Sequence, residues 1–199
     1  QLQFTATSNI GLGANAVDSI TTGDQNVGLG DNVLTATTEG NYNTGLGERS
    51  LTTNTTGSSN TAIGGLALFS NTTGDKNVAV GQQALYTNTT ATYNTAVGYD
   101  ALRMNTTGFD NVAVGRMSLD ANTTANYNTA VGSLALSANT TGAANTGLGY
   151  GTLNLNTTGR DNTAVGYAAL NSNTTGLENA AFGMFALRFN TTGNTNTAV

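Results

Sequence analysis

The sequence lacks four residue types altogether: its 199 residues include no cysteine, histidine, proline or tryptophan. Without cysteine there is no disulfide framework and no thiolate nucleophile. Without histidine the chain lacks the commonest general base and the commonest transition-metal ligand. We therefore expect no catalytic centre, no cofactor and no metal site, and we predict that the chain is not an enzyme.

Charge and long hydrophobic runs are also scarce. Charged residues make up 9% of the chain, and six basic against eleven acidic residues give a formal net charge of −5 at pH 7. That sign is unfavourable for binding nucleic acid or an anionic membrane surface. No apolar run approaches the roughly 20 residues that a transmembrane helix needs. We expect no nucleic-acid partner and no membrane insertion in this segment.

The chain does contain an internal repeat. Thr (38), Asn (28) and Gly (26) account for 92 of the 199 residues. With few exceptions, the motif Asn-[Thr/Val]-[Ala/Gly]-[Val/Leu]-Gly recurs every 17 residues, without insertion or deletion. Its Asn, which we number position 1 of the repeat, occurs at Asn9, Asn26, Asn43, Asn60, Asn77, Asn94, Asn111, Asn128, Asn145, Asn162, Asn179 and Asn196. We divide the chain into a partial leading repeat (1–8), eleven repeats (9–195) and the start of a twelfth (196–199).

The strict period predicts a β-solenoid. A one-residue insertion would turn core side chains outward, so the unchanging spacing indicates coils that stack on copies of themselves. A repeat of 17 residues is too short for a helix pair, since the common helical repeats need about 33–47 residues per unit. Thr and Val favour strands, and Gly and Asn favour turns. The predicted fold is all-β: a parallel β-solenoid or β-roll whose coils pair at a spacing of about 4.8 Å.

Two positions of the repeat are assigned to the core. Side chains alternate along the predicted strand at positions 1–5, and position 4 is apolar in every repeat. Position 9 is Leu in all complete repeats but the first. The predicted core residues are Val97, Leu102, Val114, Leu119, Val131, Leu136, Val165 and Leu170. Positions 5–11 fit either a second strand or a short helical turn, and Asn-Thr-Thr-Gly at positions 12–15 predicts a turn.

Two further columns follow from stacking. The Asn side chains at position 1 are expected to form an amide ladder, with members Asn60, Asn77, Asn94, Asn111, Asn128, Asn145 and Asn162. Position 3 is Ala or Gly in every repeat, whereas a solvent-exposed face would vary and carry charge. We therefore predict that position 3 contacts a neighbouring chain, through Ala96, Ala113, Ala130 and Ala164. The favoured assembly is a parallel homotrimer, and a self-sufficient single solenoid is the alternative.

The pattern Asn-Thr-Ala-Val-Gly-Tyr-x-Ala-Leu-x-x-Asn-Thr-Thr-Gly, at Asn94–Gly108 and Asn162–Gly176, resembles repeats of bacterial and phage surface-fibre proteins. Such tail-fibre repeats often precede a self-cleaving intramolecular chaperone domain. The Asn-x-Ala-Val/Ile-Gly core is similar to the head repeats of trimeric autotransporter adhesins, in which a shorter repeat forms a left-handed parallel β-roll and three chains pack together. The resemblance implies an extracellular location, at a cell surface or on a virion. Because the chain stops at Val199 in mid-repeat, we expect the natural protein to be longer.

The leading functional hypothesis is a structural shaft or adhesive fibre segment that acts as a rigid spacer. The first alternative is a glycan-binding or glycan-depolymerising tail fibre, because Tyr99, Tyr150 and Tyr167 share position 6. These rings would stack on the sugars of cell-surface or host glycans, or instead fill grooves between chains. The second alternative is an ice-binding solenoid, although the two Thr at positions 13 and 14 would point in opposite directions in a strand.

Two short motifs are better explained by structure than by chemistry. Nine Asn-Thr-Thr triplets match the N-glycosylation sequon, at Asn54, Asn71, Asn88, Asn105, Asn122, Asn139, Asn156, Asn173 and Asn190. Nine glycans at coil spacing could hardly all fit, and the predicted turn accounts for the motif. Acidic residues near the turns are irregularly placed, unlike the calcium-binding nonapeptide, and are interpreted as solubilising corners: Asp24, Asp75, Asp110 and Asp161.

Overall fold

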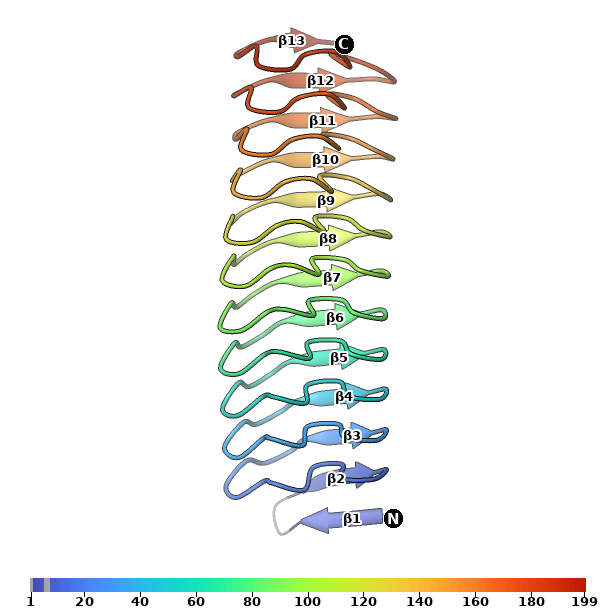
Figure 1. Ribbon diagram of the computed structural model, residues 1–199, viewed down its shortest axis with the longest axis vertical. Coiled ribbons are helices and arrows are strands. Elements are labelled where there is room, and N and C mark those ends of the chain that lie inside the picture. Colours follow the sequence, from blue (N-terminus) through green and yellow to red (C-terminus); the bar gives the residue numbers. More distant parts are fainter. Residues whose placement is uncertain (1, 6–7) are drawn as a thin grey trace.

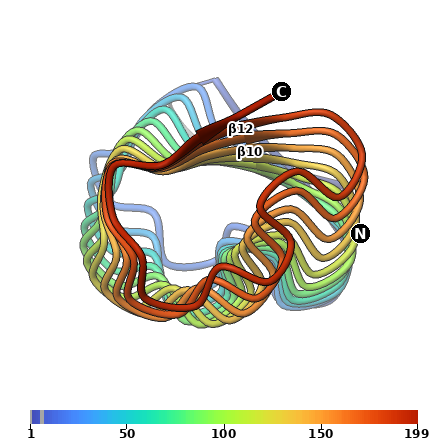
Figure 2. The ribbon, with the colours of Figure 1, turned by 90° about the horizontal axis from the view of Figure 1, so that it is seen from above.

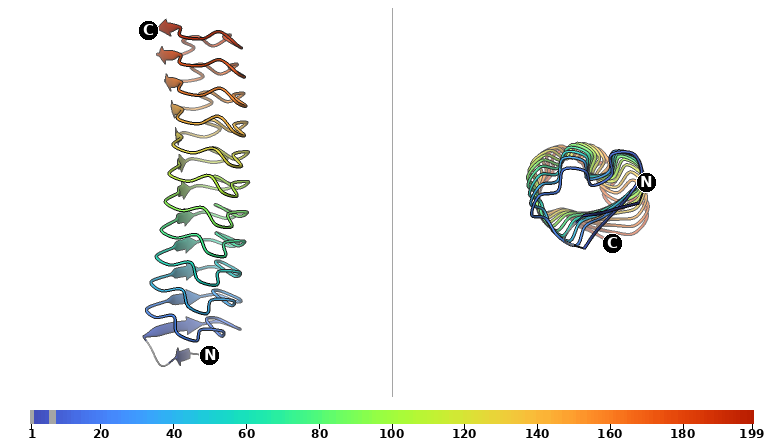
Figure 3. Two further views of the ribbon diagram at one scale, coloured as in Figure 1. Left: turned by 90° about the vertical axis from the view of Figure 1, so that its left-hand side faces the viewer. Right: turned by 90° about the horizontal axis from the view of Figure 1, so that it is seen from below.

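Each 17-residue repeat forms one coil, and the coils stack into a long column (Figure 1). The computed structural model describes residues 2–5 and 8–199, and within them it contains thirteen strands in one sheet and no helix. Viewed along the column, the coils lie over one another with a small rotation from each to the next, and the strands form one flat side (Figures 2 and 3). The predicted all-β parallel solenoid is therefore confirmed.

The order of the strands in the sheet is the same as their order in the chain. From β2 to β13, each strand pairs in parallel with the next. Between β7 and β8, for example, Thr95 lies opposite Val112 and Val97 lies opposite Val114. The strands are β1 (Leu2–Thr5), β2 (Asn9–Leu12), β3 (Val27–Leu29), β4 (Thr44–Leu46), β5 (Thr61–Ile63), β6 (Val78–Val80), β7 (Thr95–Val97), β8 (Val112–Val114), β9 (Thr129–Val131), β10 (Thr146–Leu148), β11 (Thr163–Val165), β12 (Ala180–Phe182) and β13 (Thr197–Ala198).

The first strand departs from the expected leading repeat. β1 runs antiparallel to β2, with Leu2 opposite Leu12 and Thr5 opposite Asn9. It therefore adds a reversed strand to the edge of the sheet instead of a partial coil. Parallel coil pairing begins only at β2, where Ile10 lies opposite Val27.

Outside the strands the backbone forms neither the second strand nor the helical turn that the sequence left open. Left-handed residues recur in each coil at positions 7, 9 and 17, as at Asp100 (φ 55°), Leu102 (φ 51°) and Asp110 (φ 53°). Hydrogen bonds between coils continue through these turns; the Leu102 N–H, for example, donates to the Ser118 carbonyl at 3.0 Å. At position 5 the backbone needs glycine, since Gly98 has a φ of 139° and a Cβ there would collide with the Gly115 carbonyl of the next coil.

The interior of the column holds the position-9 leucines, together with small residues at positions 3 and 8. The predicted core residues Leu102, Leu119, Leu136 and Leu170 are each 0% exposed, as the sequence predicts. They form one continuous cluster with the alanines of positions 3 and 8. In each coil one large side chain, at position 9, fills the apolar part of the interior, and the small residues at positions 3 and 8 pack around it.

The two strand faces are the reverse of the sequence prediction. The predicted interchain residues are each 0% exposed within a single chain, so they face its own core: Ala96, Ala113, Ala130 and Ala164. The predicted core residues of position 4 instead lie on the outside, where Val131 is 38% exposed and the others are half-buried: Val97, Val114 and Val165. The physical reason is space, since even a Cβ added at Gly147 would lie 2.8 Å from the Thr152 hydroxyl across the interior.

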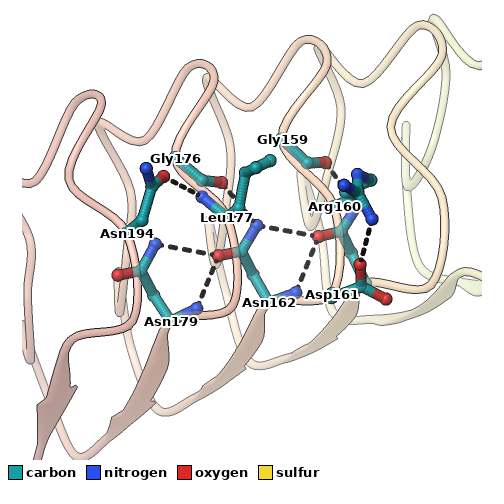
Figure 4. Close-up of polar contacts among 9 residues, drawn as sticks. Gly159, Arg160, Asp161, Asn162, Gly176, Leu177, Asn179 and Asn194 are labelled. Atoms are coloured by element: carbon teal, nitrogen blue, oxygen red, sulfur yellow. Dashed lines mark hydrogen bonds and ion pairs between the residues drawn. The ribbon is translucent and has the colours of Figure 1, made fainter.

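Asparagine ladders form the polar part of the interior (Figure 4). Asn162 donates from its amide nitrogen to the Asn145 Oδ1 (3.0 Å) and to the Gly176 carbonyl (2.9 Å), and its own Oδ1 accepts from Asn179. The predicted members are each 0% exposed: Asn60, Asn77, Asn94, Asn111, Asn128, Asn145 and Asn162. A second ladder, which the sequence analysis missed, runs through the Asn residues of position 12, as from Asn173 Nδ2 to the Asn156 oxygen at 2.8 Å.

Candidate functional site

The most distinctive surface is the outer face of the parallel sheet, which we define as the side chains of positions 2 and 4 in β2–β13. Both columns point away from the interior because position 3 points into it. No residue at these positions is buried; Leu29 is 44% and Val78 37% exposed. The outer face is a continuous strip along the column that the chain itself leaves uncovered.

The outer face carries no charge. Position 4 is aliphatic in all repeats except for Phe182, and position 2 alternates irregularly between Thr and aliphatic residues. Seven threonines stand at position 2: Thr44, Thr61, Thr95, Thr129, Thr146, Thr163 and Thr197. A long, flat and uncharged strip of this kind is unusual on an isolated soluble chain and is typical of an interaction surface.

Two mixed columns border the outer face. Position 17 precedes each strand and position 6 follows it, and both contain tyrosines as well as most of the charges near the sheet. The tyrosines are about half exposed: Tyr42, Tyr93 and Tyr127 at position 17, and Tyr99, Tyr150 and Tyr167 at position 6. The strip is therefore apolar in the middle and polar at both rims, like the core and rim of many protein interfaces.

The predicted sugar-stacking tyrosines do not form one platform. Tyr99 lies 51 residues, or three coils, before Tyr150. Tyr150 and Tyr167 stack on each other, with ring centroids 5.3 Å apart and an interplanar angle of 11°. Phe185 packs edge-on against Tyr167, also at 5.3 Å. The Tyr150–Tyr167 contact covers one face of each ring, and stacking on a sugar requires a free face.

In the described part of the chain, none of the ion pairs involves a side chain of the outer face itself. Arg103 Nε lies 3.1 Å from Asp120 Oδ1 in the next coil and 3.8 Å from Asp100 Oδ1 in its own coil. Burial raises the pKa of the Asp120 carboxyl above its usual value, and Arg103 works in the opposite direction. At position 17, a hydrogen bond to the Tyr93 hydroxyl raises the pKa of Lys76. These contacts lie within one coil or between neighbouring coils, and they do not converge on a pocket.

The turn at positions 12–15 accounts for the Asn-Thr-Thr-Gly consensus. Asn105, at position 12, is 0% exposed, and its amide nitrogen donates both hydrogens, to the Asn88 oxygen and to the Gly108 carbonyl. The position-13 hydroxyl of Thr106 contacts the Thr123 carbonyl of the next coil at 3.0 Å. Position 14 is the exposed one, as at Thr107. The amide nitrogen that a glycan would need is enclosed and used by the fold.

Among residues 2–5 and 8–199, no cluster of three or more acidic side chains is arranged to hold a metal ion. In the same part of the chain, no helix is long and apolar enough to cross a membrane. Comparisons of the chain with protein-family models, with curated proteins and with solved structures give no match. The arguments about function therefore depend on the geometry of the column.

The outer face was not predicted from the sequence because the apolar residues of position 4 were assigned to the core. One signal in the sequence could have found it. Position 3 never exceeds the size of alanine, whereas position 2 accepts Ile, Val, Thr and Ala, and position 4 ranges from Val to Phe. A narrow interior limits side-chain size strictly, so the position with the tighter size limit is the one that faces inward.

Proposed function

We propose that this chain is a structural shaft or adhesive segment of an extracellular fibre, at a cell surface or on a virion. The observation that carries the proposal is the uncharged outer face, which runs unbroken along a straight stack of nearly identical coils. A spacer needs length, rigidity and uniform sides, and a stack of coils supplies all three. The resemblance of the repeat to surface-fibre proteins supports the same assignment.

The proposed working unit is a parallel homotrimer in which the outer faces of three chains meet around a common axis. Ala96 and the other position-3 residues play no part in this contact, because they lie inside each chain. Covering the remaining exposed area of a Val or Leu at position 4 would contribute on the order of 0.5–1 kcal/mol per side chain. An obligate interface is typically more apolar than ordinary surface, which fits this strip.

Light scattering on the purified chain tests the assembly, combined with the substitution Val131→Asp on the outer face. We expect the parent to have the mass of three chains and the variant to dissociate into folded monomers with unchanged far-UV circular dichroism. The matched control is Thr141→Asp at exposed position 14, which should leave the mass unchanged. A monodisperse monomeric parent would show that the trimer is wrong.

Ice binding is a second candidate for the same surface, because the outer face combines threonine with aliphatic residues on a flat, regular sheet. The two proposals exclude each other, since a face buried in an assembly cannot contact ice. A thermal hysteresis assay on the parent, and on Thr129→Lys, separates them. Activity in a monomeric parent that is lost in the variant would favour ice binding over the shaft.

A further inference from the structure

The two ends of strand β8 carry opposite charges. Asp110 at position 17 precedes β8 and Arg116 at position 6 follows it, and both side chains are exposed. They stand at opposite rims of the outer face and form no ion pair with each other. The same strand therefore presents an acid at its start and a base at its end.

Arg116 differs from every other basic residue of the chain. Five of the six basic residues contact an acidic side chain or an aromatic ring on their own chain: Arg49, Lys76, Arg103, Arg160 and Arg188. Within residues 8–199 the Arg116 side chain has no such partner and contacts the Met117 sulfur, at 3.0 Å. Within residues 8–199 the Asp110 carboxylate likewise makes no ion pair or side-chain hydrogen bond. Both charges are available to a second molecule.

We infer that Asp110 of one copy pairs with Arg116 of the next copy, and that this ion pair sets the axial register of the fibre. The inference rests on the proposed assembly through the outer face. When copies are related by rotation about an axis parallel to the column, equivalent strands lie at the same level. The start of each strand then faces the end of its counterpart, whether two or three copies form the ring.

Compared with a shift of one coil, only the unstaggered arrangement produces a charge pair. Shifts of two or three coils bring Lys76 to Glu48 or to Asp31, but they leave two or three strands of each outer face uncovered. With no axial shift, no other strand places two charged rim residues against each other; Lys76, for example, faces Gln82. A shift of one coil places Arg116 against Tyr93 or Tyr127, and Asp110 against Ser133 or Tyr99. No like charges meet in the unstaggered arrangement, so it is favoured by attraction at β8 and opposed at no other level.

The register matters because the outer face alone specifies it weakly. Coils repeat the same Thr and aliphatic pattern, so sliding one chain by a coil replaces each contact with a similar one. A single charged pair in a uniform apolar interface discriminates between such registers at little cost to packing. Of the rim residues that face each other in the unstaggered arrangement, only Asp110 and Arg116 carry opposite charges.

Charge exchange tests the inference. Asp110→Arg and Arg116→Asp each place like charges at the contact, and we expect each to lower the association constant about 10-fold or more. The double exchange restores opposite charges and should return the constant to within about threefold of the parent. Asp18→Arg, an exposed change of equal charge at position 10, should have no effect. Dilution series followed by light scattering give the constants.

Cross-linking provides a second measurement that does not depend on pair energy. The chain has no native cysteine, so a variant carrying Asp110→Cys and Arg116→Cys can be exposed to mild oxidation, which forms a disulfide only where the two Cα atoms lie within about 7 Å. We expect closed oligomers on a denaturing gel. The matched control carries Asp110→Cys and Ser133→Cys, which are one coil out of register, and should remain largely uncross-linked.

The outcomes separate this inference from the proposed function. Rescue by the double exchange, with cross-linking at 110 and 116, supports the ion pair. An oligomeric parent in which neither single exchange changes the association constant, or in which the 110 and 133 pair cross-links instead, overturns the register and leaves the shaft intact. A monomeric parent overturns both.

Discussion

Most coils bury two asparagine side chains, at positions 1 and 12, and a buried amide is stable only when its donors and acceptors are paired. In the ladders most of these side chains accept from the Asn of the next coil, and most donate to the Asn of the coil before and to a position-15 carbonyl, as Asn162 does. The Gly108 carbonyl shows how closely the two ladders are linked, because it accepts from Asn94 at 2.8 Å and from Asn105 at 2.9 Å. The ladders require an amide at both positions. Position 1 is always Asn, and position 12 is Asn in every complete coil except the first two, which have Ile20 and Thr37 there.

The first prediction concerns Asn162→Asp. A carboxylate has the shape of the amide but cannot donate, so the Asn145 oxygen and the Gly176 carbonyl would each face another oxygen. Because the site is fully buried, we expect a loss of at least about 2 kcal/mol in the free energy of unfolding. Urea unfolding measures it.

The matched control is Asn126→Asp at position 16. There the side-chain oxygen only accepts, from the Phe109 N–H at 2.8 Å, and a carboxylate keeps that bond. We expect a change within about 0.5 kcal/mol. Equal effects of the two substitutions would mean that the ladder hydrogen bonds do not govern stability.

Single residues also show how far the sequence could predict the interior. The position-9 leucines and the position-1 ladder followed from hydrophobicity and from amide stacking, and both lie where they were expected. The strand faces were reversed because a two-residue period identifies two faces without saying which is inside. Both faces are uncharged here, so only the size limit at position 3 distinguishes them.

At the scale of one coil, the interior is governed by the combined size of positions 3 and 8, which face each other across it. Alanine at position 3 accompanies Ala at position 8 in six coils, as in Ala96 with Ala101. Glycine accompanies a larger partner, as in Gly28 with Val33, Gly45 with Ser50 and Gly147 with Thr152. Gly11 with Ala16 and Ala113 with Ser118 are exceptions, for which we have no structural explanation.

The second prediction tests this compensation with Gly147→Ala and Thr152→Ala. The added methyl alone would lie 2.8 Å from the Thr152 hydroxyl, and overpacking of that kind costs about 1–3 kcal/mol. In the Thr152→Ala background the clash is absent, and the double variant has the Ala–Ala pair of other coils. We expect the double variant to be at least about 1 kcal/mol more stable than the sum of the single effects.

The four proteins of the double-mutant cycle, compared by urea unfolding, provide the measurement. Effects that add to within about 0.5 kcal/mol would show that the two side chains do not share space. The backbone between them could not have been predicted from the sequence. Its three left-handed positions per coil include leucines such as Leu102, a residue type that rarely adopts this conformation, and the stacked neighbours hold it there.

At the scale of the whole molecule, each coil contacts only the coils before and after it, so stability is close to a sum of coil and interface terms. The parallel stack and its length were predictable because the 17-residue interval never varies. The antiparallel β1 was not, since residues 2–5 carry no repeat signal. The exposed outer face was not predicted either, because it depends on the direction of the strand side chains, which only the size limit at position 3 indicates.

The third prediction follows from this one-dimensional order. Deleting residues 128–144 removes one complete coil and joins Tyr127 to Asn145, so that position 17 is again followed by position 1. β8 then pairs with β10, and both ladders continue without a gap. We expect a folded chain with unchanged far-UV circular dichroism, shorter by about 4.8 Å in its small-angle scattering profile.

Deleting residues 128–143 removes one residue fewer and leaves Ala144 as an insertion within the stack. Either the two ladders fall out of step at that level, or the odd residue must bulge out of a backbone whose hydrogen bonds run from coil to coil. A one-residue shift exchanges the inner and outer faces of a strand, which would place position-4 side chains where only alanine fits. We therefore expect the 16-residue deletion to be far less stable in urea than the 17-residue deletion, although it removes less of the protein. If both deletions unfold at the same urea concentration, the stack tolerates breaks in its period, and the strict spacing of the repeat needs another cause.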